Sequence, residues 1–600
     1  MYWLKRLKQA LTIAALYVLV ACAGPAPVSA PEQVGRIPGG ELIEVPPPGE
    51  ETEYGAALLE ASALLQERQL LPAASILRDI DSSKLTVDER AQVLLMQTEL
   101  LYLQGQGPTA LTELQAQLPQ LQPLHPGREW QLQQWQLRLL RATRGNLPAA
   151  RHADNLLELG PEDEQREVLV KFIWHQLQLS SEARLNEALR TTGSRQWSAW
   201  LELALLAGNV MDSPDVQVEE LELWRQRHPN HPVGGKLPGG LELLSPLGAA
   251  PPSRIAILLP LSGGLEADGR AILEGFLAAQ FEARRQGWPE QQLLVMDSTR
   301  FEDINAAYQN AVAAGAELVI GPLAPEALAE WQPPERMPAP LLTLDWMPQS
   351  PQSDTPPYQM ALAAEDEARQ LARLAFDAGA RDALLIRPRG DWGDKMADSL
   401  IQTWSGLEGS VHAIATYSGQ SDYSSSLKEA LNLAESEKRA NKLRRVMGSL
   451  EFSPRRRKDI DAVFLLSSTP QDARSIKPLI AFHYAGDLPV YSTSQIYSGR
   501  RDPQRDRDLN GIRLVEIPWI LNPDSRVRGK IGDAGSTETL AARYAQGADA
   551  FLLHWRLGQL REDTANRVRG YTGLLSMDMD GRLHRELVPA RMRAGIPEAL

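Results

Sequence analysis

The apolar residues of the chain follow two different periods, and the change between them divides the sequence. Over residues 52–227, apolar side chains recur three and four positions apart, as in Leu58, Ala61 and Leu65. This spacing places them on one face of an α-helix, and the alternation typical of strands is absent. We therefore expect residues 52–227 to form a domain built of helices.

A short proline signal repeats within this helical region. Pro72, Pro108 and Pro148 are each followed by small residues and stand about 36 and about 40 residues apart. Proline is well tolerated in the first turn of a helix, where its missing N–H would have no partner. A period in this range, with two helices per unit, resembles tetratricopeptide-like arrays. The full consensus is not met, so an irregular helical bundle stays open as the alternative.

From Arg254 onward the pattern changes to short, continuous apolar runs. Such runs are typical of parallel strands buried on both faces of a sheet. The expected strands are 255–261, 293–296, 318–320, 341–344, 383–386, 411–415, 462–466 and 489–491. The expected helices between and after them are 267–286, 303–314, 365–378, 393–405, 422–447, 470–484 and 538–558. Repeated βα units over residues 253–600 predict an α/β domain of two lobes, each with a doubly wound parallel sheet, and a natural ligand cleft between them.

Residues 228–252 interrupt both patterns with many prolines and glycines, and we expect an interdomain linker there. His228 and His231 stand three apart in this segment. The flanking prolines prevent a helix that would align the two rings, and no third ligand is near. We therefore expect no metal site.

The N-terminus combines Lys5, Arg6 and Lys8 with an apolar run that extends to Ala21. This is the pattern of an export signal over residues 1–21, and the apolar run is too short to span a bilayer. The sequence Leu-Val-Ala-Cys that ends at Cys22 resembles a bacterial lipobox. The resemblance implies cleavage before Cys22 and lipidation of its thiol. An ordinary signal peptide with an incidental cysteine is the alternative.

The residues that follow the cysteine indicate where the chain is held. Ala23, and not an aspartate, follows Cys22, which by resemblance to sorted lipoproteins implies the outer membrane with the body of the chain in the periplasm. Residues 22–51 are rich in proline and glycine, so we expect a lipid-anchored, extended linker. It would serve either as a tether that lets the body act away from the membrane or as a simple spacer.

Composition narrows the classes of function. Six hundred residues predict several domains, and the net charge of −14 argues against broad nucleic-acid binding. Cys22 is the single cysteine, so the mature chain is held together by its core without disulfides. No second apolar run is long enough for a transmembrane helix.

Several segments of the C-terminal region resemble known families. Residues 254–264 with 272–276, and residues 320–323, resemble type I periplasmic binding proteins. A tighter resemblance, to the LppC lipoproteins that are penicillin-binding protein activators of the LpoA type, is carried by Leu344-Asp-Trp346, Asp391-Trp-Gly-Asp394, Asp461-Ala-Val-Phe-Leu465, Ile480-Ala-Phe-His-Tyr484, Tyr491-Ser-Thr-Ser494, Gly511-Ile, Ile517-Pro-Trp519, Ala548-Asp-Ala-Phe551 and Gly570-Tyr-Thr-Gly573. The resemblance implies an outer-membrane lipoprotein that binds a class A penicillin-binding protein, a bifunctional peptidoglycan synthase, and stimulates its transpeptidase.

The common catalytic motifs are absent from the sequence. It contains no Gly-x-Ser-x-Gly elbow, no His-Glu-x-x-His and no Walker loop. Ser425 and Lys428 have the spacing found in penicillin-binding proteins, but the Lys-Thr-Gly element is missing and the serine lies in a polar run that reads as a helix start. We expect no catalytic residues and no cofactor.

Two sets of residues are candidate contact sites. In amino-acid-binding relatives, the turn after the first strand contacts a ligand carboxylate; the residues at this and neighbouring strand ends are Ser262, Gly263, Gly264, Gly321, Pro322 and Asp345. A solute-binding lipoprotein that captures an amino acid or a muropeptide is therefore the rival function, although Asp345 would repel a carboxylate and the pocket could have been lost.

The second set is Arg455, Arg456 and Arg457, a cationic run that follows a basic helix. It is a candidate docking patch for an acidic partner surface or for anionic wall polymer such as peptidoglycan. A solvated charged face is the alternative.

Overall fold

The computed structural model describes residues 53–67, 69–121, 123–209, 214–244, 251–334, 336–347, 356–447, 455–532, 540–564 and 566–600. The predicted signal peptide, Cys22 and the whole of the predicted linker 22–51 lie outside these residues. Within the part described, no helix combines the length and the apolar character needed to cross a membrane.

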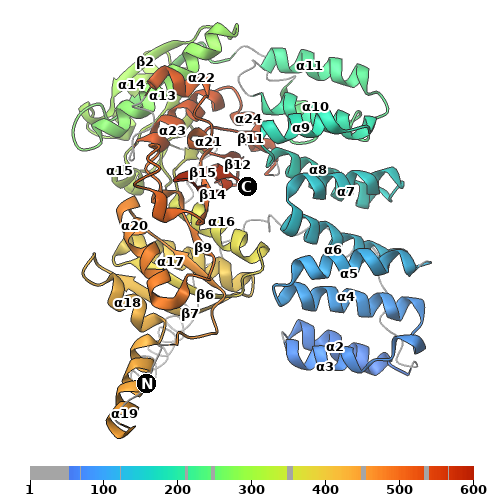
Figure 1. Ribbon diagram of the computed structural model, residues 1–600. Coiled ribbons are helices and arrows are strands. Elements are labelled where there is room, and N and C mark those ends of the chain that lie inside the picture. The colour runs from blue at the N-terminus through green and yellow to red at the C-terminus, as the bar shows by residue number, and fades with distance from the viewer. Residues whose placement is uncertain are drawn as a thin grey trace, which may run out of the picture. The chain divides into compact units, whose positions relative to one another are not determined.

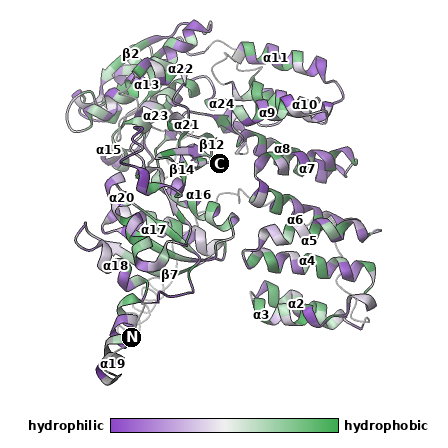
Figure 2. Ribbon diagram, in the orientation of Figure 1, coloured by the Kyte–Doolittle hydropathy of each residue, from purple (hydrophilic) through white to green (hydrophobic). Residues whose placement is uncertain are grey.

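The first described region is an array of helices that pack in sequence order (Figure 1). Figure 2 shows both hydrophobic and hydrophilic colours along these helices, as expected of helices with one buried face. Their bounds are α2 Gly55–Gln66, α3 Leu70–Asp79, α4 Val87–Leu103, α5 Gly107–Gln117, α6 Pro126–Arg144, α7 Asn146–Glu158, α8 Asp163–Gln178, α9 Glu182–Thr191, α10 Arg195–Gly208 and α11 Pro214–Arg227.

The repeated prolines occupy equivalent places in this array, which confirms the expectation of helix pairs. Pro72, Pro108 and Pro148 lie in the first turns of α3, α5 and α7, the second helix of each pair. After α11 the chain turns back onto the array, and the His231 ring packs edge-on against Trp200 and Trp224, at 4.9 and 5.0 Å between ring centroids. This histidine is part of the packing of the array.

The α/β region has two lobes. Lobe 1 contains an eight-stranded sheet in the order β11-β12-β13-β5-β4-β3-β1-β2. Its strands are β1 Arg254–Leu259, β2 Gln292–Asp297, β3 Leu318–Ile320, β4 Leu341–Thr343, β5 Tyr358–Met360, β11 Val568–Arg569, β12 Leu574–Met577 and β13 Arg582–Glu586, and its helices include α13 Glu266–Arg285, α14 Ile304–Ala313, α15 Pro325–Glu330, α21 Pro518–Leu521, α22 Arg526–Ile531, α23 Ala541–Leu553 and α24 Leu557–Glu562.

Lobe 2 contains a seven-stranded sheet in the order β15-β14-β10-β9-β8-β6-β7. Its strands are β6 Asp382–Pro388, β7 Ser410–Tyr417, β8 Ala462–Leu465, β9 Val490–Ser492, β10 Arg513–Glu516, β14 Val588–Arg593 and β15 Ile596–Ala599, and its helices include α16 Ala364–Asp377, α17 Asp391–Gly406, α18 Tyr423–Ala430, α19 Leu433–Met447 and α20 Pro470–Ile480. Within each lobe the first five strands are parallel and run in the order 2-1-3-4-5, which confirms the predicted doubly wound sheets.

The chain passes between the lobes three times. It enters lobe 2 after β5, returns to lobe 1 after β10, and enters lobe 2 again between β13 and β14. On its return, α23 packs tightly along α13, because Gly275 and Gly547 allow close backbone approach: a Cβ on Gly275 would lie 2.0 Å from the Tyr544 carbonyl oxygen. The buried core of lobe 1 therefore joins residues from both ends of the region.

The structure differs from the prediction in two of the expected helices and in several additional strands. The expected helix 422–447 is divided into α18 and α19, because Asn432 has φ +57° and ends the first helix in a left-handed conformation. The expected helix 470–484 ends as α20 at Ile480 and continues as a π-type turn over 481–485. Strands β5 and β10–β15 were not expected, because each contains polar or charged residues and so lacks a continuous apolar run.

Candidate functional site

The predicted ligand-contacting turn of lobe 1 holds a carboxylate of the chain itself. The Asp297 side chain, at the end of β2, accepts hydrogen bonds from the Leu261 N–H at 3.1 Å and the Ser262 hydroxyl at 2.9 Å. The Thr299 hydroxyl donates to the same carboxylate at 2.7 Å, and it leads the interactions that lower the pKa of Asp297 to about 2. Asp297 therefore stays ionised and occupies donors that a ligand carboxylate would need.

The other predicted cleft residues lie at neighbouring strand ends of the same sheet. Gly321 and Pro322 follow β3 through a cis peptide bond and are buried. Gly321 has φ +103°, and a Cβ there would lie 1.9 Å from the Leu258 carbonyl oxygen, so only glycine fits. Asp345 follows β4 and accepts from the Trp346 N–H at 2.8 Å; burial raises its pKa. These residues shape the strand ends and add a second carboxylate.

A charged network joins the two lobes at the first crossover. The His584 ring, on β13 of lobe 1, is 3.0 Å from an oxygen of Asp578 and 3.4 Å from one of Asp366, which stands in the first turn of α16. Burial opposes the charged ring, but the hydrogen bonds to the two carboxylates prevail and raise the pKa of His584 to about 9. The imidazolium thus links β13 to the start of α16 at neutral pH.

Buried carboxylates hold the same region from the lobe 2 side. The Glu367 carboxylate accepts from the Ser494 N–H at 3.0 Å and from its hydroxyl at 2.8 Å, which ties α16 to the segment after β9. Glu516 lies at the second crossover and accepts from the Ile517 N–H. Burial raises the pKa of both carboxyls, and the charge of Glu367 raises the pKa of Glu516 further. The hinge between the lobes is therefore packed and hydrogen-bonded.

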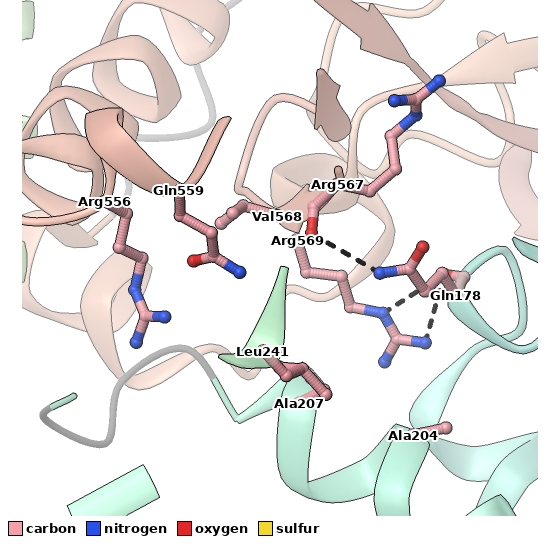
Figure 3. A pocket seen from close by; sticks show the side chains of 10 residues that line it. Gln178, Ala204, Ala207, Leu241, Arg556, Gln559, Arg567, Val568 and Arg569 are labelled. Atoms are coloured by element: carbon pink, nitrogen blue, oxygen red, sulfur yellow. Dashed lines mark hydrogen bonds between the residues drawn. The ribbon is translucent and has the colours of Figure 1, made fainter. Parts of the chain in front are cut away.

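The helical array is attached to lobe 1 through the C-terminus of α8. The Arg569 guanidinium, from β11, donates to the carbonyl oxygens of Leu177, Gln178 and Ser180 at 2.7 to 3.2 Å, as Figure 3 shows for Gln178. A Cβ on Gly208 would lie 2.7 Å from this guanidinium. The adjoining cavity has a volume of about 20 Å³, room for about one water molecule. The contact between Arg569 and the end of α8 is therefore a structural joint between the array and lobe 1.

The array is also attached to lobe 2. The Arg141 guanidinium reaches both oxygens of Asp377 at 3.0 and 3.2 Å. Gly105, in the turn between α4 and α5, meets Gly379 backbone to backbone: a Cβ on Gly105 would lie 2.4 Å from the Gly379 carbonyl oxygen. Arg381 donates to the Tyr102 carbonyl oxygen at 2.7 Å. The array therefore contacts both lobes, on either side of the hinge.

The three arginines of the predicted docking patch differ in their surroundings. Arg456 is buried; its guanidinium donates to the Tyr484 carbonyl oxygen at 2.8 Å and to Asp487 at 2.7 Å. Arg457 is bound by the Asp459 carboxylate at 2.7 and 2.8 Å. Arg455 is exposed. The structure thus gives Arg456 and Arg457 structural contacts and leaves Arg455 at the surface.

Sequence reasoning missed Asp297 and the hinge network of Asp366, Glu367 and His584. The signal for Asp297 was the carboxylate that directly follows the apolar run of β2, at the same sheet edge as Ser262. The hinge residues gave no such signal, because they come together from α16 and β13, which lie more than 200 residues apart in the chain. Among the described residues, no group of three or more His, Cys, Asp or Glu side chains is placed to hold a metal ion.

Two lobes with strand order 2-1-3-4-5, joined by three crossovers, define a domain of the type I periplasmic-binding-protein class, here preceded by a helical array. The family described as "LppC putative lipoprotein" matches residues 48–595, and the chain belongs to this family.

Curated relatives include proteins named as activators of penicillin-binding proteins. The chain is 27% identical over 540 residues to "Penicillin-binding protein activator LpoA" of Photobacterium profundum, covering 88% of this chain and 86% of the relative. It is 26% identical over 547 residues to the protein of the same name from Vibrio antiquarius, with 88% of each covered. Among solved structures, full-length LpoA from Haemophilus influenzae matches at a TM-score of 0.47 and 20% identity over 91% of this chain and 95% of that one.

Proposed function

We propose that this chain is a periplasmic lipoprotein that binds a class A penicillin-binding protein and stimulates its transpeptidase. The observation that carries the proposal is the similarity to proteins named penicillin-binding protein activators, which spans 88% of the chain and so includes both the helical array and the two lobes. A regulator that acts by contact needs no catalytic group of its own, in keeping with the absence of catalytic motifs from the sequence.

The lobe 1 turn supports this proposal over the rival function of solute capture. An amino-acid receptor needs donors there for a ligand carboxylate. Here the Ser262 hydroxyl and the Leu261 N–H already bind the Asp297 carboxylate, and a second carboxylate, Asp345, follows β4. A ligand carboxylate would meet negative charge at this edge of the sheet.

A thermal-shift screen on the full chain separates the two functions. A ligand at 100 times its dissociation constant adds about 2.7 kcal/mol to the free energy of unfolding. We expect the twenty amino acids and a set of muropeptides to leave the melting temperature unchanged, and the purified cognate synthase to bind the chain. A large shift with any of the small molecules, together with no binding to the synthase, would instead establish a solute receptor.

The proposed anchor is a lipid on Cys22, with the body of the chain in the periplasm at the outer membrane. Support comes from the lipobox-like sequence and from membership of a family described as lipoproteins. Labelling with a radioactive fatty acid tests it: wild-type chain should incorporate label and sediment with the outer membrane, and Cys22→Ser should do neither. Equal fractionation of the two forms would remove the anchor from the proposal.

A further inference from the structure

Two aromatic side chains of lobe 2 stand in solvent on one turn. Phe482 is 72% exposed and Tyr484 is 51% exposed, in the π-type turn that follows α20. Between them, His483 is 4% exposed and bonds the Ser424 hydroxyl at 2.9 Å. The buried ring therefore fixes the turn to α18, and the two aromatic side chains point outward.

One residue of this turn has an unusual backbone conformation. Tyr484 has φ +62° and ψ +22°, the left-handed region, where glycine is the usual residue after a helix. The buried Arg456 holds this conformation, since its guanidinium bonds the Tyr484 carbonyl oxygen and the Asp487 carboxylate. A strained position that carries a large exposed aromatic residue points to a use for the side chain.

The segment that supplies Arg456 to this turn is strongly basic in sequence. Residues 433–458 contain nine Lys and Arg against three Glu, in a chain whose net charge is −14. Arg455 and Lys458 are exposed beside the turn, and Lys438, Arg439, Lys442 and Arg445 are exposed on α19. The neighbouring acids Glu435, Glu437 and Asp487 are bound by Lys438, Lys428 and Arg456. The surface therefore presents rigid aromatic anchors with a positive surround.

We propose that Phe482 and Tyr484, with Arg455 and Lys458 beside them, form the docking surface for an acidic partner surface that bears an apolar pocket. Exposed aromatic residues on a rigid turn are typical of the residues that dominate protein–protein binding energy, and the cations around them steer an acidic partner. This inference rests on the proposed function, and the partner is then the class A penicillin-binding protein. An anionic membrane is the other surface that aromatic and basic residues could contact.

The test measures binding of the full chain, purified in detergent, to the immobilised cognate synthase. The double variant Phe482→Ala/Tyr484→Gly should weaken binding by about tenfold or more. It should not lower the melting temperature, because glycine suits the left-handed backbone at position 484. Phe281→Ala is the matched control, because Phe281 is a 54% exposed aromatic residue on α13 of lobe 1 and its loss should leave affinity unchanged.

The charge component is tested separately. Arg455→Glu should slow association and reduce the dependence of the association rate on salt, whereas Arg300→Glu, at a highly exposed arginine of lobe 1, should do neither. The triple change Arg455, Arg456 and Arg457 to Glu is less informative, because Arg456 and Arg457 hold the fold.

Three outcomes would overturn the inference. If wild-type chain binds the synthase and the double variant binds equally well, the docking surface is wrong and the proposed function stands. If wild-type chain does not bind the synthase at all, the docking surface and the proposed function are both wrong. If the double variant keeps its affinity for the synthase but loses binding to vesicles of phosphatidylethanolamine and phosphatidylglycerol, the surface contacts a membrane.

Discussion

At the scale of single residues, charged side chains are placed where the two lobes meet. His584 lies between Asp366 and Asp578, its ring stacks edge-on against Trp346 at 5.2 Å between centroids, and Arg582, Arg585 and Arg369 are close by. The two carboxylates outweigh the burial and raise the pKa of His584 to about 9, so the ring is charged at neutral pH.

This arrangement predicts a pH dependence of stability. The pKa of His584 is raised from 6.5 to about 9 in the folded chain, so its contribution is fully present below pH 6.5 and is lost as pH rises through about 9. The difference corresponds to at most about 3 kcal/mol of unfolding free energy. Denaturant unfolding at pH 6 and pH 9.5 should show this loss in wild-type chain, and His584→Gln should show a smaller one. Parallel curves for the two proteins would contradict the assignment.

Residue-level chemistry was only partly readable from the sequence. The turn at Ser262 could be located because a glycine pair follows an apolar strand, but its Asp297 partner comes from the next strand, 35 residues away. Arg456 was grouped with Arg455 and Arg457 because adjacent residues share a charge. The fold separates them, since one guanidinium is buried against Asp487 while its neighbour Arg455 faces solvent.

At the scale of elements, the end of α8 depends on a side chain from a distant strand. The last carbonyl groups of a helix have no partner within it. Here Arg569, on β11, donates to carbonyl oxygens at this end, and burial lowers the pKa of its guanidinium to about 10. Arg569 therefore has two roles: it supplies donors to the C-terminus of α8, and it attaches the array to lobe 1.

Removal of this arginine should weaken the joint. Arg569→Ala leaves buried carbonyl groups without donors, and we expect a loss of about 3 kcal/mol in unfolding free energy. Arg569→Lys should have an unfolding free energy between those of the wild type and Arg569→Ala, because an ammonium group cannot span all the carbonyl oxygens. Arg591→Ala, at an exposed arginine of β14, is the control for the loss of one positive charge. A change of less than about 0.5 kcal/mol for Arg569→Ala, the range of ordinary surface substitutions, would contradict this role.

Strands with a continuous apolar run and helices with a clear period were predictable, and strands that alternate apolar with charged residues were not. The buried parallel strands, such as β1 and β8, gave continuous apolar runs, and the helices of the array gave a clear period. Strand β14, in contrast, alternates buried Ala590 and Met592 with exposed arginines over only six residues. Its place in lobe 2 is set by antiparallel pairing with β10, more than 70 residues earlier in the chain, which local patterns do not report.

At the scale of the whole molecule, the helical array contacts each lobe separately. Arg569 joins it to lobe 1, while Arg141, Tyr102 and Gly105 join it to lobe 2. A solute receptor needs its lobes to open and close about the hinge, and a body attached on both sides of the hinge opposes that motion. Attachment of the array to both lobes therefore favours a fixed relative position of the lobes, as a protein that acts through a rigid contact surface needs.

A single added methyl group, in Gly379→Ala, should separate the array from lobe 2 at their backbone contact. Gly379 has φ +99°, and a Cβ there would lie 2.8 Å from the Gly105 carbonyl oxygen, so Gly379→Ala should separate the two backbones. Hydrogen–deuterium exchange should then rise at residues 102–107 and 376–381 and stay unchanged at the Arg569 joint. Gly406→Ala, where a Cβ would meet no atom within 4 Å, is the control. Unchanged exchange at both junctions would show that the contact is not needed.

The central claim is that this chain activates a peptidoglycan synthase by contact, and the direct measurement is the fraction of cross-linked muropeptides that the purified cognate class A penicillin-binding protein makes from lipid II. Added full-length chain should raise this fraction severalfold, and the Phe482→Ala/Tyr484→Gly variant should raise it less at the same concentration. An equal fraction with and without the wild-type chain, under conditions in which the synthase alone is active, would contradict the account.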